Sequence, residues 1–261
     1  MNWLIKISKN LVNIPSEADS MTNELAEMVF DNFASIQNPT YQNLYQSIDG
    51  LSKIYNTPEA TYIFAMQEPD NVPTGMSAGG FTQIYTAQDQ NELIPKLQSL
   101  RSAPSNFVYP VIFIGVSPQT IAGLVFSWID SGANVVENRE HIIQAITRII
   151  KHENVHGFDK QIRGKRKTFT GLPEEPWTQN RATEVTAYSN VLAKDILDSV
   201  RSGKIDRENL ITWLRNPSDK SLFSTIASGT RNSFDAERWF NFYGSYPQVT
   251  GYLAQLIYKS L

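Results

Sequence analysis

The chain has 261 residues, of which 41% are hydrophobic, with a formal net charge of −3 and no cysteine. This length and apolar content suit one large domain, or a catalytic domain with a smaller appendage, and the charge excludes a general preference for nucleic acid or anionic membranes. Without cysteine the fold contains no disulfide, and any zinc ion must be held by nitrogen and oxygen ligands.

The longest apolar stretches, residues 111–116 and 121–129, are much shorter than the ~20 residues that a membrane span needs. The start of the chain has too short an apolar run for a signal peptide. We therefore expect a soluble, cytoplasmic protein without a membrane partner, and a nucleic-acid partner is not favoured.

The first third of the chain has mainly helical patterns. A helix capped by Ser16 is predicted to run to about Ala34, and a second helix begins after Asn38-Pro39. These helices define an N-terminal helical segment, residues 1–58. Residues 59–261 are expected to form the main domain, unless the whole chain folds as one.

Strand patterns follow at residues 61–66, 81–87 and 109–116, with a helix at 90–101 between the last two. Residues 118–136 fit two structures. Ser117-Pro118 is a typical helix start, whereas the apolar run at 124–129 also suits a strand. We favour a strand here.

From residue 138 onward the patterns are helical. Helices are predicted from 138 through the second histidine of the motif described below, and at about 181–201, 207–215, 222–227, 234–242 and 248–260. Together with the strands, they predict a helix-rich α+β fold with a small sheet.

Residues 152–156 read His-Glu-Asn-Val-His and contain two of the three histidines in the chain. On a helix, side chains four positions apart share one face, so His152 and His156 can reach a single metal ion. Glu153 then points toward the open coordination position, where it can take a proton from water. This HExxH pattern predicts a zinc hydrolase.

The two histidines continue an apolar stripe on the same helix. Ala145, Ile149, His152 and His156 are spaced four, three and four residues apart, which predicts that they face inward. Gly157 follows directly. A glycine there either lets the chain leave the helix or lets another element approach it closely.

HExxH together with Glu184-x-x-Ala187-Tyr188 resembles the gluzincin branch of the zinc metallopeptidases, or zincins. The resemblance covers about residues 138–200. It implies a zincin-like domain within residues 59–261, with a small sheet beside the HExxH helix and a C-terminal helical subdomain. It also implies that Zn²⁺ is held by His152, His156 and Glu184, and that the substrate is a protein or peptide.

Other residues are weaker candidates for the third ligand. The metzincin pattern does not fit, because Ile162 stands where its third histidine should be. His141 lies eleven residues before His152, which is ~16 Å along a helix and too far to share an ion. Asp159, Asp235 and the pair Glu174-Glu175 remain possible ligands, ranked below Glu184.

The resemblance to zincins also implies catalytic roles for residues that do not bind the metal. Glu153 acts as the general base for attack of water on an amide carbonyl. The negative intermediate needs a further hydrogen-bond donor. Tyr188, one turn after Glu184 on the same helix face, is the first candidate for that donor, followed by Arg181 and Tyr246.

Two other hypotheses stay open. The chain is alternatively a catalytically inactive structural or assembly protein with a zincin fold, because most residues outside 138–200 resemble no peptidase. Separately, residues 1–58 are a candidate autoinhibitory segment that covers the catalytic cleft.

Overall fold

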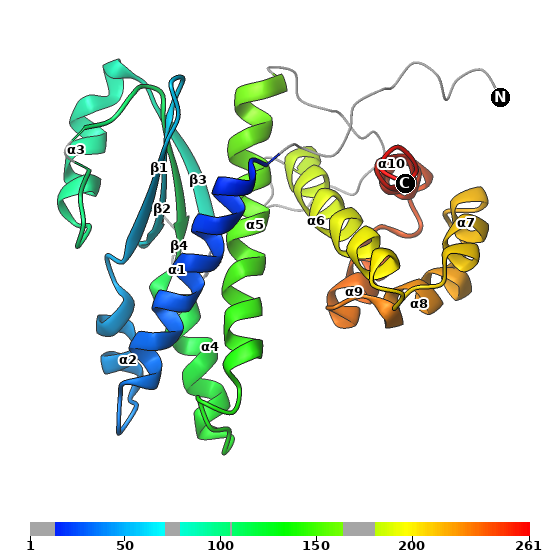
Figure 1. Ribbon diagram of the computed structural model, residues 1–261, viewed down its shortest axis with the longest axis horizontal. Coiled ribbons are helices and arrows are strands. Elements are labelled where there is room, and N and C mark those ends of the chain that lie inside the picture. The colour runs from blue at the N-terminus through cyan, green and yellow to red at the C-terminus, as the bar shows by residue number, and fades with distance from the viewer. Residues whose placement is uncertain (1–13, 71–78, 105, 164–180) are drawn as a thin grey trace. The chain divides into compact units, whose positions relative to one another are not determined.

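The computed structural model describes residues 14–70, 79–104, 106–163 and 181–261, without the side chains of 159–163 and 181–183 (Figure 1). The predicted α+β fold, rich in helix and with a small sheet, is confirmed. The chain divides into two compact units, which we term the N-terminal unit (Ile14–Gln161) and the C-terminal unit (Ile162–Leu261).

The N-terminal unit is built on a four-stranded mixed sheet with the order β1-β2-β4-β3. The strands are β1 (Ser52–Asn56), β2 (Thr61–Met66), β3 (Gly80–Tyr85) and β4 (Val111–Val116). The central strands β2 and β4 are parallel and buried along their whole length, whereas β1 and β3 are antiparallel edge strands. Since side chains alternate along a strand, each face of the sheet has its own core.

One face of the sheet is covered by α3 (Gln90–Gln98), which follows the short 3-10 helix η1 (Ala87–Asp89) (Figure 1). Leu93 and Leu97 of α3 pack there against Ile63 and Phe113 of the central strands. The same helix carries the buried Lys96, whose ammonium group lies 2.8 Å from Asp70.

The opposite face carries the remaining helices of this unit: α1 (Ser16–Ala34), α2 (Tyr41–Ile48), α4 (Pro118–Asp130) and α5 (Arg139–Arg163). Helix α1 packs on β1 and β2, and α2 packs on α1 and α4. Helix α5 reaches the sheet through Phe158, whose ring stacks on Tyr62 of β2 with 4.6 Å between centroids. The α5 helix is therefore packed directly on the sheet.

Two expectations about this unit are wrong. Residues 118–130 form helix α4 and not a strand, because Ser117 Oγ accepts a hydrogen bond from the backbone N–H of Thr120 (3.0 Å) and Pro118 occupies the first turn. In addition, Ser52–Asn56 forms strand β1 within the segment expected to be helical. Residues 14–58 belong to the same compact unit as the sheet.

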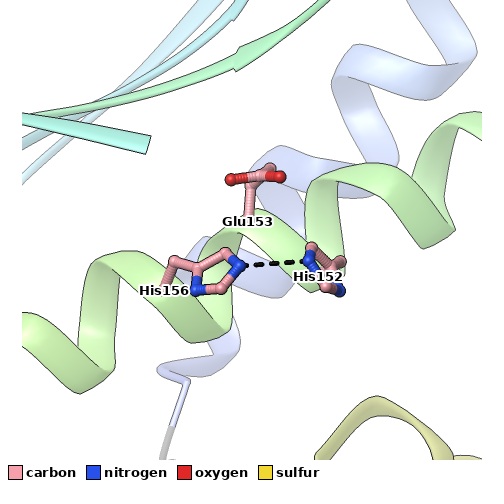
Figure 2. Close-up of side chains that lie close together, drawn as sticks. All are labelled: His152, Glu153 and His156. Carbon is pink, nitrogen blue, oxygen red and sulfur yellow. Dashed lines mark hydrogen bonds between the residues drawn. The ribbon is translucent and has the colours of Figure 1, made fainter. Parts of the chain in front are cut away.

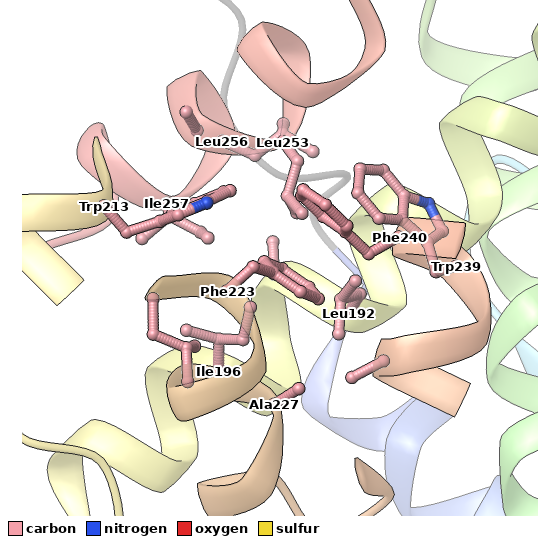
Figure 3. Close-up of a cluster of buried hydrophobic side chains, with 14 of the residues drawn as sticks. Leu192, Ile196, Trp213, Phe223, Ala227, Trp239, Phe240, Leu253, Leu256 and Ile257 are labelled. Carbon is pink, nitrogen blue, oxygen red and sulfur yellow. The ribbon is translucent and has the colours of Figure 1, made fainter. Parts of the chain in front are cut away.

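The C-terminal unit is helical throughout its described residues. Its helices are α6 (Arg181–Arg201), α7 (Arg207–Arg215), α8 (Lys220–Gly229), α9 (Ser233–Tyr243) and α10 (Pro247–Tyr258), close to the predicted ranges. They enclose an apolar core in which the ring of Phe223 stacks on Phe240 and lies near Trp213 (Figure 3). Trp239 and Phe240 of α9 belong to this core.

Candidate metal centre

His152 and His156 lie one turn apart on the buried side of α5, as their spacing predicts. Their exposed fractions are 8% and 6%. The two Nε2 atoms are 3.0 Å apart, and the rings meet at 80° (Figure 2). At that distance the ring that carries the Nε2 proton donates it to the other, and both nitrogens converge on one point in space.

The geometry of the pair fits a shared metal ion. Nitrogen ligands ~2.0–2.1 Å from zinc and at the tetrahedral angle are about 3.3 Å apart. The observed 3.0 Å therefore needs to widen by only a few tenths of an ångström. The ligating atoms of His152, Glu153 and His156 all lie within 4.8 Å of one another. This buried group can hold a metal ion.

Glu153 is held by the edge strand β3. Its side chain is 7% exposed, and Thr82 Oγ1 lies 2.9 Å from its Oε2 and 2.8 Å from its backbone carbonyl oxygen. Figure 2 shows the carboxylate beside the two imidazoles. Thr82 is 71 residues away in sequence, and no local pattern marked it as part of the site.

Helix α5 approaches the sheet closely at the end of the motif. A Cβ at Gly157 would lie 3.1 Å from Ile112 Cγ2 of β4, so any larger residue would press the helix away from the strand. The helix continues to Arg163. Of the two roles predicted for Gly157, close approach of another element is therefore the one observed.

Asn154 of the motif serves the packing of α5 on α1. It is fully buried, and its Nδ2 donates to Thr22 Oγ1 at 3.0 Å. The hydroxyl of Thr22 in turn donates to the carbonyl oxygen of Ala18 (2.9 Å). A polar link between the two helices thus fixes the rotation of α5, and with it the direction of both histidines.

The other predicted residues lie outside the N-terminal unit or outside the described side chains. Glu184 and Tyr188 are on α6 of the C-terminal unit, where Glu184 is half-buried and Tyr188 is 50% exposed, so their roles beside the histidines stay predictions. Asp235 accepts a hydrogen bond from Asn232 Nδ2 (2.6 Å) at the start of α9. Tyr246 packs against the core of the same unit.

Four further candidates cannot be placed beside the histidines. Glu174 and Glu175 lie outside the described residues, and the side chains of Asp159 and Arg181 are not among those described. His141, which its distance along the helix excluded as a ligand, is an exposed residue near the start of α5.

Comparison of the chain with models of known protein families, with curated proteins and with solved structures gave no match. Among the described residues, no helix has the length and apolar character needed to cross a lipid bilayer.

Proposed function

We propose that this protein is a zinc-dependent metallopeptidase. The observation that carries the proposal is the convergence of two buried imidazoles and a buried carboxylate on one turn of α5. Burying three ionisable side chains together costs free energy, and such groups concentrate where a protein binds ions or performs chemistry. The HENVH spacing makes zinc the metal that this donor set suits best.

His152 and His156 would hold the ion through their Nε2 atoms, and Glu184 is our candidate for the third ligand. When bound, zinc supplies a Lewis acid that makes a neighbouring water more acidic and polarises a carbonyl group. Tyr188 is our candidate donor to the negative charge that develops on the carbonyl oxygen of the substrate.

Glu153 would act as the general base. Its carboxylate is close to the imidazoles but is held separately, by the hydroxyl of Thr82 on β3. A carboxylate so placed takes a proton from the attacking water and passes it to the nitrogen of the leaving amine. Hydrolysis of a peptide bond requires both proton transfers, and Glu153 would carry out both.

The Glu153→Gln variant tests this assignment. The amide has nearly the shape of the carboxylate but cannot accept the proton, so we expect loss of peptide hydrolysis by at least 100-fold, with the metal content unchanged. Turnover of an unstructured protein such as casein, measured beside metal content, gives both values. Equal turnover in the variant and the wild type would overturn the proposed mechanism.

The alternative is a protein of structural or assembly function that has no hydrolase activity. The direct 3.0 Å hydrogen bond between the two imidazoles favours it, because that bond also satisfies a buried histidine pair without a metal. If this alternative holds, the wild-type protein hydrolyses no peptide whichever metal ion is added. The Glu153→Gln variant then assembles in the same way as the wild type.

A further inference from the structure

The edge strand β3 contacts Glu153 at two positions on the same face. Thr82 Oγ1 is within hydrogen-bond distance of both Glu153 Oε2 (2.9 Å) and the Glu153 carbonyl oxygen (2.8 Å). A hydroxyl has one hydrogen, so the two acceptors share a single donor. The contact therefore joins the side chain of Glu153 to the backbone of its own helix through the strand.

Gly80 shapes the other side of the same contact. A Cβ at this position would lie 2.8 Å from Glu153 Cγ and 3.0 Å from Ile149 Cγ2. Residues 80 and 82 point to the same face of the strand, since side chains alternate. The absent side chain of Gly80 thus makes room for the stem of Glu153, while Thr82 holds its carboxylate.

The far side of β3 is locked in place by Phe81. Its ring lies flat against Phe113 of β4, with 5.8 Å between centroids and 9° between planes. A Cβ at Gly115 would come within 2.0 Å of the Phe81 ring, so only glycine allows the ring to lie there. The ammonium group of Lys96 lies 5.0 Å from the centre of the same ring. These contacts prevent β3 from sliding relative to the sheet.

We propose that Thr82 is the positioning residue for the general base of this enzyme, acting through Glu153 and not on the substrate. The inference rests on the proposed metallopeptidase function. By holding Oε2, the hydroxyl of Thr82 fixes the rotamer of Glu153. A general base that already has its reactive rotamer loses less entropy when the reaction begins.

The test compares Thr82→Val, which keeps the shape and removes the hydroxyl, with Thr82→Ser, which keeps the hydroxyl. Loss of a hydrogen-bond partner that orients a residue of a metal site typically lowers activity by about 10–100-fold. We expect kcat to fall by about that factor in Thr82→Val, with KM and zinc content unchanged, and to stay within about threefold of the wild type in Thr82→Ser. Equal kcat values in all three proteins would overturn the proposal, and so would equal losses in the two variants.

A second readout keeps the inference separate from the proposed function. Crystal structures of the wild type and of Thr82→Val, both with zinc added, show whether the carboxylate moves. We expect a rotated or doubly placed Glu153 side chain in Thr82→Val, even if the wild type proves inactive toward peptides. An unmoved, singly placed carboxylate would overturn the positioning role. Absence of hydrolysis in the wild type would instead overturn the proposed function.

Discussion

The two compact units bury different kinds of side chain. Among the described residues, the buried acidic, basic and histidine side chains are Lys96, His152, Glu153 and His156, and all belong to the N-terminal unit. The buried polar residues of the C-terminal unit are neutral hydroxyl and amide side chains around an apolar core. The buried charged and imidazole groups of the described residues thus gather in the N-terminal unit, mostly on α5, where the chemistry is proposed.

The largest loss of stability is expected at the centre of the C-terminal core. Phe223 is 1% exposed and touches rings on α7 and α9 (Figure 3). Phe223→Ala should therefore lower the free energy of unfolding by about 3–5 kcal/mol, measured by chemical denaturation. The control is Phe234→Ala on α9. Phe234 is 72% exposed, so its replacement should change the free energy of unfolding by less than about 0.5 kcal/mol. Similar losses in the two variants would contradict the described core.

A matched pair of glycines compares the units directly. Gly115→Ala places a Cβ within 2.0 Å of the Phe81 ring and should cost about 1–3 kcal/mol, because the ring and β3 must shift. Gly251 lies within α10, and apart from its own helix backbone no described atom lies within 4 Å of an added Cβ, so Gly251→Ala should stabilise by up to about 1 kcal/mol. Thermal unfolding of both variants measures the difference. The same sign in both would show that the packing of β3 is not as described.

The smallest effect concerns a half-buried carboxylate of the C-terminal unit. Burial raises the pKa of Asp195 on α6, although backbone N–H groups of Arg231 and Asn232 partly offset this. A raised pKa in the folded state means that the contribution of Asp195 is most favourable below the ordinary pKa of an aspartate. That contribution is lost as the pH rises through the raised value.

Asp195→Asn should remove this pH dependence. We expect a slightly higher melting temperature than the wild type at pH 7 and no difference near pH 3, because both side chains are then neutral. Asp198→Asn on the same helix should have a smaller effect, because it breaks a surface ion pair with Arg201 and also removes a negative charge that helps to raise the pKa of Asp195. If Asp195→Asn melted at a lower temperature than the wild type at pH 7, burial of the charge would not be the dominant influence of Asp195 on stability.

Periodicity and caps were sufficient to predict most helices. Helices at about Ser16–Ala34 and at Arg207–Arg215 were predicted because their apolar positions follow one helical face. The predicted cap at Ser16 is wrong, since Ser16 is the first helical residue and Pro15 occupies the N-cap. Residues 124–129 were misassigned since a short apolar run fits a helix and a strand equally, and the cap at Ser117 decided in favour of the helix. Strand β1 was missed because its five residues gain their stability from pairing with β2.

The candidate site was predictable only where it is local. The spacing of His152 and His156 within one helix was enough to predict that they meet. The contact of Glu153 with Gly80 and Thr82 could not be predicted, because it depends on the strand order and on which face of β3 meets α5. Contacts between distant segments are set by packing, and a single sequence contains no periodic signal for them.

Metal content of the freshly purified protein is the most direct test of the central claim. We expect about one zinc per chain in the wild type by plasma mass spectrometry, and a loss of most of it in His156→Ala. His141→Ala is the control, because this exposed histidine on the same helix should leave the zinc content unchanged. No zinc in the wild type after dialysis against it, or full zinc in His156→Ala, would contradict the account.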